Sequence, residues 1–196
     1  INPLDLIKEY GVDPVRYYLM REMVLGQDAN FTLDSFIKRY NSDLANDFGN
    51  LLNRISTLIH KNYDGIIPHS RELTLDEKII KDAAIELVSE IDGKIMNMKI
   101  NEAIEDIMQF IRRINKYMEE QAPWKLVKEN KDEAGRILYT AGESLRIGAS
   151  LLSPVMPNRT SILLEALNTG RSTEWGGLKS GSKIRDHQPL FPRIQV

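Results

Sequence analysis

The chain has 196 residues, of which 42% are hydrophobic and 28% charged, and it contains no cysteine. A chain of this length can bury a core of its own, so it needs neither a disulfide nor a metal to fold. The lack of cysteine excludes a disulfide framework and a thiolate zinc site. No apolar run approaches the ~20 residues that span a bilayer. The formal net charge of -2 excludes a basic sheath over the whole surface, so any contact with nucleic acid has to be local.

The first residues carry two helix starts. Asn2 followed by a proline predicts a helix cap and a first helix that ends near Tyr10. Asp13 followed by a second proline predicts another cap and a helix that runs to about Met23. Because the chain opens on Ile1 and leads at once into a helical pattern, we expect it to be a piece of a longer protein.

The strongest amphipathic pattern lies between residues 43 and 61. It follows a loop expected over 26–30 and a short helix that is capped by Thr32 and ends near residue 40. Apolar side chains at helical spacing predict one buried face, made of Leu44, Phe48, Leu51, Ile55, Leu58 and Ile59. The opposite face is polar and carries Asn46, Asn50, Asn53, Arg54 and Thr57.

Four further helices and one short helical turn follow. Thr74 with Glu77 three residues later predicts a capping box. The helix that it opens has an apolar pattern made of Ile79, Ile80, Ala83, Leu87 and Ile91. A helix over 101–119 is expected to turn a similar set inward, namely Ile104, Ile107, Met108, Ile111 and Ile114. A break before Trp124 starts a short helical turn, and helices are expected over 132–152 and 158–167.

These elements together predict an all-α fold, an antiparallel helical bundle joined by short loops. Residues 169–196 are rich in Gly, Ser, Lys and Pro and show no long period. We expect them to form a short irregular C-terminal tail that packs back on the bundle through Leu190, Phe191 and Ile194.

Residues suited to catalysis are scarce. The three histidines show no metal-ligand spacing and are expected to face solvent or cap helices; they are His60, His69 and His187. The pair Gly176-Gly177 lacks the strand before it and the helix after it that a phosphate-binding loop requires. Glu102 and Asp106 lie four apart on one expected helix, which is typical of a solvated face. We therefore predict no catalytic residue and no metal ligand in this chain.

Three stretches resemble the C-terminal half of the methionyl-tRNA synthetase family. Residues 10–19, YGVDPVRYYL, are similar to the family pattern that follows its Lys-Met-Ser-Lys-Ser loop. Neither that loop nor the His-Ile-Gly-His signature occurs in this sequence. Residues 41–54, NSDLANDFGNLLNR, resemble the first anticodon-domain helix, and residues 120–124, EQAPW, resemble an Ala-Pro-Trp turn. The resemblance continues to PLFPRI at residues 189–194.

The resemblance implies a division of the chain and a set of partners. Residues 1–31 would be linker and stem-contact helices after the catalytic domain, 32–168 the anticodon-binding bundle, and 169–196 the tail. The linker side chains Arg16, Tyr17 and Tyr18 are expected to make packing contacts. The implied partners are the methionine tRNA, through its anticodon loop, and the catalytic domain, in the cytoplasm and without a membrane. ATP and magnesium, with zinc left open, are implied for the intact enzyme and no cofactor for this chain; its oligomeric state stays open.

The family's anticodon-reading residues correspond to Asn50, Arg54 and Trp124, with Asn46 and Asn53 beside them. Asn50 and Arg54 are four apart, so both point from one face of a helix. An amide and a guanidinium there can reach the Watson–Crick edge of an unpaired cytosine, which offers two acceptors and one amino donor. Trp124 would supply a stacking face, the usual companion of such edge contacts in RNA reading.

Two other functions stay open at this point. Synthetases for leucine, valine, isoleucine and cysteine share variants of these motifs, so another class I anticodon-binding domain is the first alternative. The second is a helical protein-interaction module without RNA binding, because a row of Asn and Arg opposite an apolar face is usually only solvated. A tryptophan after proline is also more often a core residue than an RNA platform. Whether Trp124 and Arg54 share an exposed face discriminates between these readings.

Overall fold

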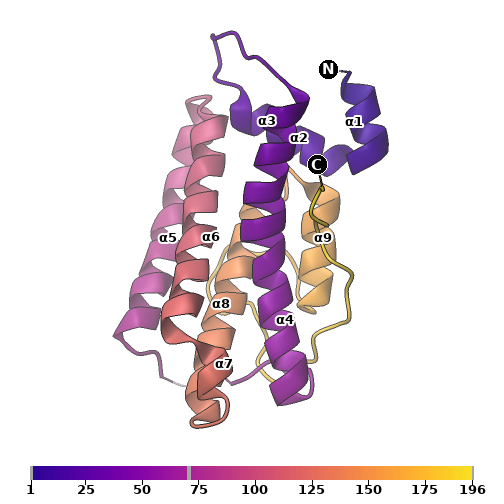
Figure 1. Ribbon diagram of the computed structural model, residues 1–196. Coiled ribbons are helices and arrows are strands. Elements are labelled where there is room, and N and C mark those ends of the chain that lie inside the picture. Colours follow the sequence, from indigo (N-terminus) through magenta and orange to yellow (C-terminus); the bar gives the residue numbers. More distant parts are fainter. Residues whose placement is uncertain (1, 70–71, 196) are drawn as a thin grey trace.

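The computed structural model describes residues 2–69 and 72–195, and within them the chain forms a helical bundle (Figure 1). The first elements are α1 (Pro3–Tyr10), α2 (Val12–Glu22), α3 (Leu33–Arg39), a π-helix η1 (Tyr40–Gly49) and α4 (Asn50–Tyr63). The later ones are α5 (Leu75–Met96), α6 (Ile100–Gln121), the short α7 (Pro123–Leu126), α8 (Lys131–Leu152) and α9 (Pro157–Ala166). The only β feature among the described residues is an isolated antiparallel bridge between Ile66 and Lys183. The prediction of an all-α bundle is confirmed.

Helix α8 is the centre of the bundle, in contact with α4, α5, α6, α7 and α9. Every residue from Ile137 to Ser150 is buried. Small residues allow this close packing: a Cβ added to Gly148 would lie 2.7 Å from Cδ1 of Ile111 on α6. No helix of the described chain is long and apolar enough to cross a membrane.

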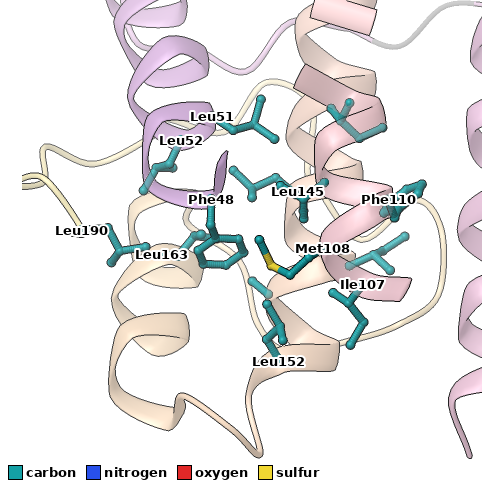
Figure 2. Packing of buried hydrophobic residues seen from close by; sticks show 14 of the residues in the cluster. Phe48, Leu51, Leu52, Ile107, Met108, Phe110, Leu145, Leu152, Leu163 and Leu190 are labelled. Carbon is teal, nitrogen blue, oxygen red and sulfur yellow. The ribbon is translucent and has the colours of Figure 1, made fainter. Parts of the chain in front are cut away.

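The apolar face predicted for residues 43–61 lies in the core. Phe48, Leu51 and Leu52 are fully buried and face side chains of α6 and α8 such as Met108 and Leu145 (Figure 2). Ile79, which we had included in the apolar pattern of α5, is instead 44% exposed. The reason is that α5 packs on the bundle from one side only, against α6 and α8, and the neighbouring Ile80 occupies the inner position.

The two helices expected over 32–40 and 43–61 are one continuous helical run from Leu33 to Tyr63, which corrects that prediction. Asn41 and Ser42, which lie between the two expected helices, direct their side chains to partners that do not interrupt the helix. The Asn41 amide bonds to the backbone of Ile194 at 2.9 Å, and Ser42 Oγ donates to Asp43 Oδ1 at 2.8 Å. The middle of the run is the π-helix η1, a form with wider i→i+5 turns that often occurs near functional sites.

Three of the predicted helix caps are confirmed and one is wrong. Asn2, Thr32 and Thr74 cap α1, α3 and α5, the last two through capping boxes. Asp13, predicted to cap α2, instead accepts a hydrogen bond at 2.6 Å from the backbone N–H of Arg159 in the first turn of α9. The first turn of α9 has unpaired N–H groups that need an acceptor. Helix α2 begins after Gly11, so Asp13 already lies inside that helix and is not its cap.

Helix α2 is attached to the rest of the bundle by hydrogen bonds. Arg16 Nε donates to the carbonyl of Val155 at 2.9 Å, and its Nη2 donates to that of Pro154 at 2.7 Å. Tyr17 is fully buried and donates to Asp43 Oδ2 at 2.8 Å. These are packing contacts of the kind expected from the sequence, and they tie α2 to η1 and to the α8–α9 junction.

The C-terminal tail packs back on the bundle, as predicted. Leu190 and Phe191 are buried and Ile194 is half-buried. The tail is also held by a pair on α8 that the sequence reading did not single out, Glu143 and Arg146, whose side chains are 0% exposed and 2.7 Å apart.

The buried carboxylate of Glu143 sits in a cradle of tail amides. The backbone N–H groups of Gly176, Gly177 and Leu178 donate to it at 2.5, 3.0 and 2.8 Å. Arg146 donates in turn to the tail carbonyl of Ser172 at 2.6 Å. Consecutive backbone N–H groups form an anion-binding concavity, and here its occupant is the chain's own glutamate.

Candidate nucleic-acid interface

Four of the five predicted site residues lie along the outward side of η1 and α4. Asn46 in η1 and Asn50 at the start of α4 are exposed, and Arg54 follows one turn later with a half-buried side chain. Asn53 is half-buried beside them. The row faces outward because the apolar side chains of the same helices occupy the core. We refer to Asn46, Asn50 and Arg54 as the Asn–Arg row.

The fifth residue, Trp124, is brought to this row by a sharp turn after α6. Helix α6 ends at Ala122, whose φ of 43° lies in the left-handed region, a conformation that costs a non-glycine residue about 1–2 kcal/mol. Pro123 then begins α7 and is buried, while Trp124 is half-buried. The reversal of the chain places the indole at the surface beside α4.

Arg54 and Trp124 are in direct contact. The guanidinium carbon of Arg54 lies over the indole, 5.3 Å from the ring centroid, within the range of a cation–π interaction. Its Nη2 also pairs with Glu119 Oε1 at 2.8 Å, with side-chain exposures of 21% for Arg54 and 64% for Glu119. The structure thus brings together the two residues whose proximity discriminates between the functions, at the surface but with both side chains half-buried.

Glu119 was not among the residues predicted for this site. It lies on α6, five positions before Trp124, and only the packing of α6 beside α4 brings it to Arg54. The sequence signal was weak, since Glu119 and Glu120 at the end of an amphipathic helix resemble any solvated pair.

The three asparagines are placed differently from Arg54. Within the described residues, the side-chain amide of Asn50 has no hydrogen-bond partner, and Asn46 Nδ2 makes only a 3.3 Å contact to Asp47 Oδ1. The amide of Asn50 is therefore free to donate to or accept from a ligand, one helical turn from the Arg54–Trp124 pair.

The surroundings of the site carry both signs of charge. Lys116 Nζ and Glu120 Oε1 are 3.6 Å apart on α6, and Lys125 is exposed next to Trp124. Burial raises the pKa of the Asp47 carboxyl, and the neighbouring Arg112 opposes this shift. The described residues contain no group of three or more His, Cys, Asp or Glu side chains that could hold a metal ion. The arrangement is suited to stacking and hydrogen bonding with a ligand.

Comparison with known proteins first gives the class. Residues 1–56 match the family model described as tRNA synthetases class I (M). The fold matches a crystal structure of the apo form of Mycobacterium tuberculosis methionyl-tRNA synthetase, with a TM-score of 0.94 and 32% identity, over 100% of this chain and 41% of that one. A structure of the same enzyme bound by methionyl-adenylate matches with a TM-score of 0.94 and 31% identity, over 98% of this chain and 40% of that one. These matches place the chain among the class I tRNA synthetases.

The particular family follows from the rest of the chain. Residues 67–187 match the model described as the anticodon binding domain of methionyl tRNA ligase. The methionine–tRNA ligases of Clostridium acetobutylicum and Bacillus subtilis are 40% and 38% identical, each over 100% of this chain and over 32% and 31% of their own length. The chain belongs to the methionyl-tRNA ligase family and spans about a third of the length of these curated relatives.

Proposed function

We propose that this chain binds the anticodon loop of the methionine tRNA through Arg54, Trp124 and Asn50, with Asn46 and Asn53 at the margin. The observation that carries the proposal is the contact between Arg54 and Trp124, two side chains that are both half-buried at the surface. A tryptophan packed only as a core residue would be covered on both faces. The family match favours the methionine tRNA over the tRNAs of other class I synthetases.

In this proposal Trp124 stacks on the first anticodon base, a cytosine, and Arg54 donates to its ring nitrogen and carbonyl oxygen. Asn50, which has both a donor and an acceptor, completes the reading of the base edge. Stacking on an aromatic side chain is worth roughly 1–3 kcal/mol per base. Edge contacts then distinguish cytosine from other bases, the usual division of labour in RNA recognition.

In the absence of RNA, only weak contacts hold the Arg54 guanidinium over the indole of Trp124, so it can move to a base. Glu119 is 64% exposed, and an ion pair whose carboxylate is open to solvent contributes about 0–1 kcal/mol. An exposed cation–π contact contributes about 0.5–1 kcal/mol. The guanidinium can therefore leave the face of the indole for a base at small cost, and Glu119 keeps it near the base edge until then.

The same proposal extends to the parent protein, which would ligate methionine to its tRNA with ATP, forming the adenylate first. ATP and magnesium would act in the catalytic part. The parent protein is expected in the cytoplasm. Because both nucleotide-binding signatures of the family are absent from the sequence, we expect no methionine-dependent ATP–pyrophosphate exchange from this chain alone. ATP–pyrophosphate exchange by the pure chain would contradict the proposal that the catalytic residues lie outside this chain.

The proposed function is tested by binding to anticodon stem-loops that differ only in the first anticodon base. The parent chain should bind the cytosine form more tightly than the uridine form, and Arg54→Gln should remove most of that preference. If Arg54 contacts only phosphate, Arg54→Gln should weaken every sequence alike and lower the slope of log affinity against log salt by about one unit. If the parent chain binds none of the stem-loops, the interaction-module alternative is favoured, and if it binds all of them equally, the proposed reading of the first anticodon base is wrong.

A further inference from the structure

A cavity of about 620 Å³ opens on the outward face of α3 and η1, beyond the end of the Asn–Arg row. Its walls include Asp34, Lys38, Asn41, Asn46 and Arg193. Asn46 belongs both to this cavity and to the Asn–Arg row, so the two are continuous along one helical run. At about 1.5 Å per residue, Lys38 and Arg54 lie roughly 20 Å apart along this run.

Arg193 is held at the cavity by anchors on both sides of it in the sequence. Phe191 is buried, with its ring centroid 5.9 Å from that of Tyr40 and 6.3 Å from that of Phe48. Asn41 donates from Nδ2 to the carbonyl of Ile194 and accepts from its N–H at Oδ1, both at 2.9 Å. Arg193 itself is exposed. The tail thus fixes the backbone on which the guanidinium is carried and leaves its donors facing solvent.

The two cations of this cavity differ from other cations of the described chain in their pairing. Within the described part of the chain, neither Lys38 nor Arg193 forms an ion pair. The next residue, Arg39, shows the contrast, since it pairs with Glu22 at 2.6 Å and Asp43 at 3.3 Å. Two unpaired cations against one exposed carboxylate, Asp34, leave the cavity with an excess of donors. A guanidinium and an ammonium that line one cavity suit a phosphate group.

We propose that this cavity binds a backbone phosphate of the anticodon stem, with Lys38 and Arg193 as its donors and Asn41 as the residue that positions Arg193. The inference rests on the proposed function. A tRNA whose anticodon loop lies at Arg54 and Trp124 has to extend toward the catalytic part, which in that proposal adjoins the N-terminal end. The run from Arg54 to Lys38 leads toward that end of the bundle, where α1 and α3 lie (Figure 1).

The test compares two RNAs, the full anticodon arm with its stem and a single-stranded oligonucleotide with the loop sequence alone. For the full arm, Lys38→Gln and Arg193→Gln should each lower the slope of log affinity against log salt by about one unit, and the double variant by about two. The losses should not depend on the first anticodon base. For the loop alone, the same variants should bind as the parent does. Lys78→Gln, an exposed lysine on α5, is the matched control and should change neither binding.

Two further variants test the sign of the charge effect and the role of the tail. Asp34→Asn removes the one carboxylate of the cavity and should strengthen binding of the full arm. Asn41→Ala releases the tail beside Arg193 and should weaken binding of the full arm as much as Arg193→Gln does. In this background, Lys38→Gln should still cause its own further loss of affinity. A thermal melt shows first that each variant is folded.

The outcomes separate this inference from the proposed function. A parent chain that binds no anticodon arm would overturn both. A parent that prefers cytosine, with a folded Lys38→Gln/Arg193→Gln variant that keeps its affinity and salt slope for the full arm, would overturn the phosphate site alone. Equal losses for the full arm and the loop would also overturn it, because the cavity would then contact the loop and not the stem.

Discussion

The guanidinium of Arg54 lies over the indole of Trp124, 5.3 Å from the ring centroid, although the two residues come from different helices of the bundle. The contact depends on two features, the outward side of α4 and the left-handed Ala122 that turns the chain after α6. The core and the turn at Ala122 hold the backbone of both residues in place. Substitutions at the site should therefore change RNA binding, whereas substitutions in the core should change stability.

The core face of the run from η1 to α4 is tested by a pair of alanine substitutions. Leu51 is fully buried, so Leu51→Ala should lower the free energy of unfolding by roughly 2–5 kcal/mol. Asn46 on the other side is exposed, and Asn46→Ala should stay within about 0.5 kcal/mol of the parent. Urea denaturation measures both values. Equal losses would mean that the inward and outward faces have been exchanged.

The attachment of the tail to α8 is tested at a glycine. A Cβ added to Gly177 would lie 2.5 Å from Cζ of the buried Arg146. Gly177→Ala should therefore destabilise the chain by about 1–3 kcal/mol through overpacking. Gly170 has no heavy atom within 4 Å of such a Cβ, so Gly170→Ala is the matched control and should stay within about 0.5 kcal/mol. A neutral Gly177→Ala in the same denaturation assay would show that Arg146 does not hold the tail as described.

Tyr63 predicts a loss of stability at alkaline pH. Burial, assisted by the nearby Asp132 carboxylate, raises the pKa of Tyr63 from 10.0 to about 12. The unfolded chain loses this proton near pH 10 while the folded chain keeps it, so the contribution is complete below pH 10 and is lost as pH rises toward 12.

The Tyr63→Phe variant isolates this contribution. Between pH 10 and 12 its free energy of unfolding should fall less steeply than that of the parent, measured by urea denaturation at a series of pH values. At pH 7 it should already be less stable, by about 0.5–1.5 kcal/mol, because it lacks the 2.6 Å hydrogen bond to the carbonyl of Lys131. If the free energies of unfolding of the two proteins fall in parallel, the pKa of Tyr63 is not raised in the folded chain.

Features that depend on neighbours in the sequence could be predicted. The capping box of Thr74 and Glu77 and the buried face containing Phe48 and Leu51 need only a residue type and a helical period, and the structure confirms them. Asp13 has the same local signature as a cap, yet its partner is the first turn of α9. Only the packed fold brings that partner near, which is why local reasoning assigned it to the wrong helix.

Neither the π-helix η1 nor the buried pair Glu143–Arg146 could be predicted, because both depend on contacts between segments far apart in the sequence. The wider turns of η1 bring the Asp47 carbonyl within 2.9 Å of the Asn115 amide on α6, and no sequence period shows such a contact. Glu143 binds amides of the tail whose loop has no regular period. At the candidate site, the resemblance placed Arg54 and Trp124, whereas Glu119 became visible only when α6 was placed beside α4.

The most direct test of the account is the affinity of Trp124→Ala for the methionine anticodon stem-loop, measured across a range of salt concentrations. An unchanged thermal melt has to show first that the variant is folded. If the indole stacks on an anticodon base, binding should weaken by roughly 1–3 kcal/mol. The slope of log affinity against log salt should stay the same, because that slope counts phosphates neutralised by cations. A folded Trp124→Ala chain that binds the stem-loop as tightly as the parent would contradict the proposed site.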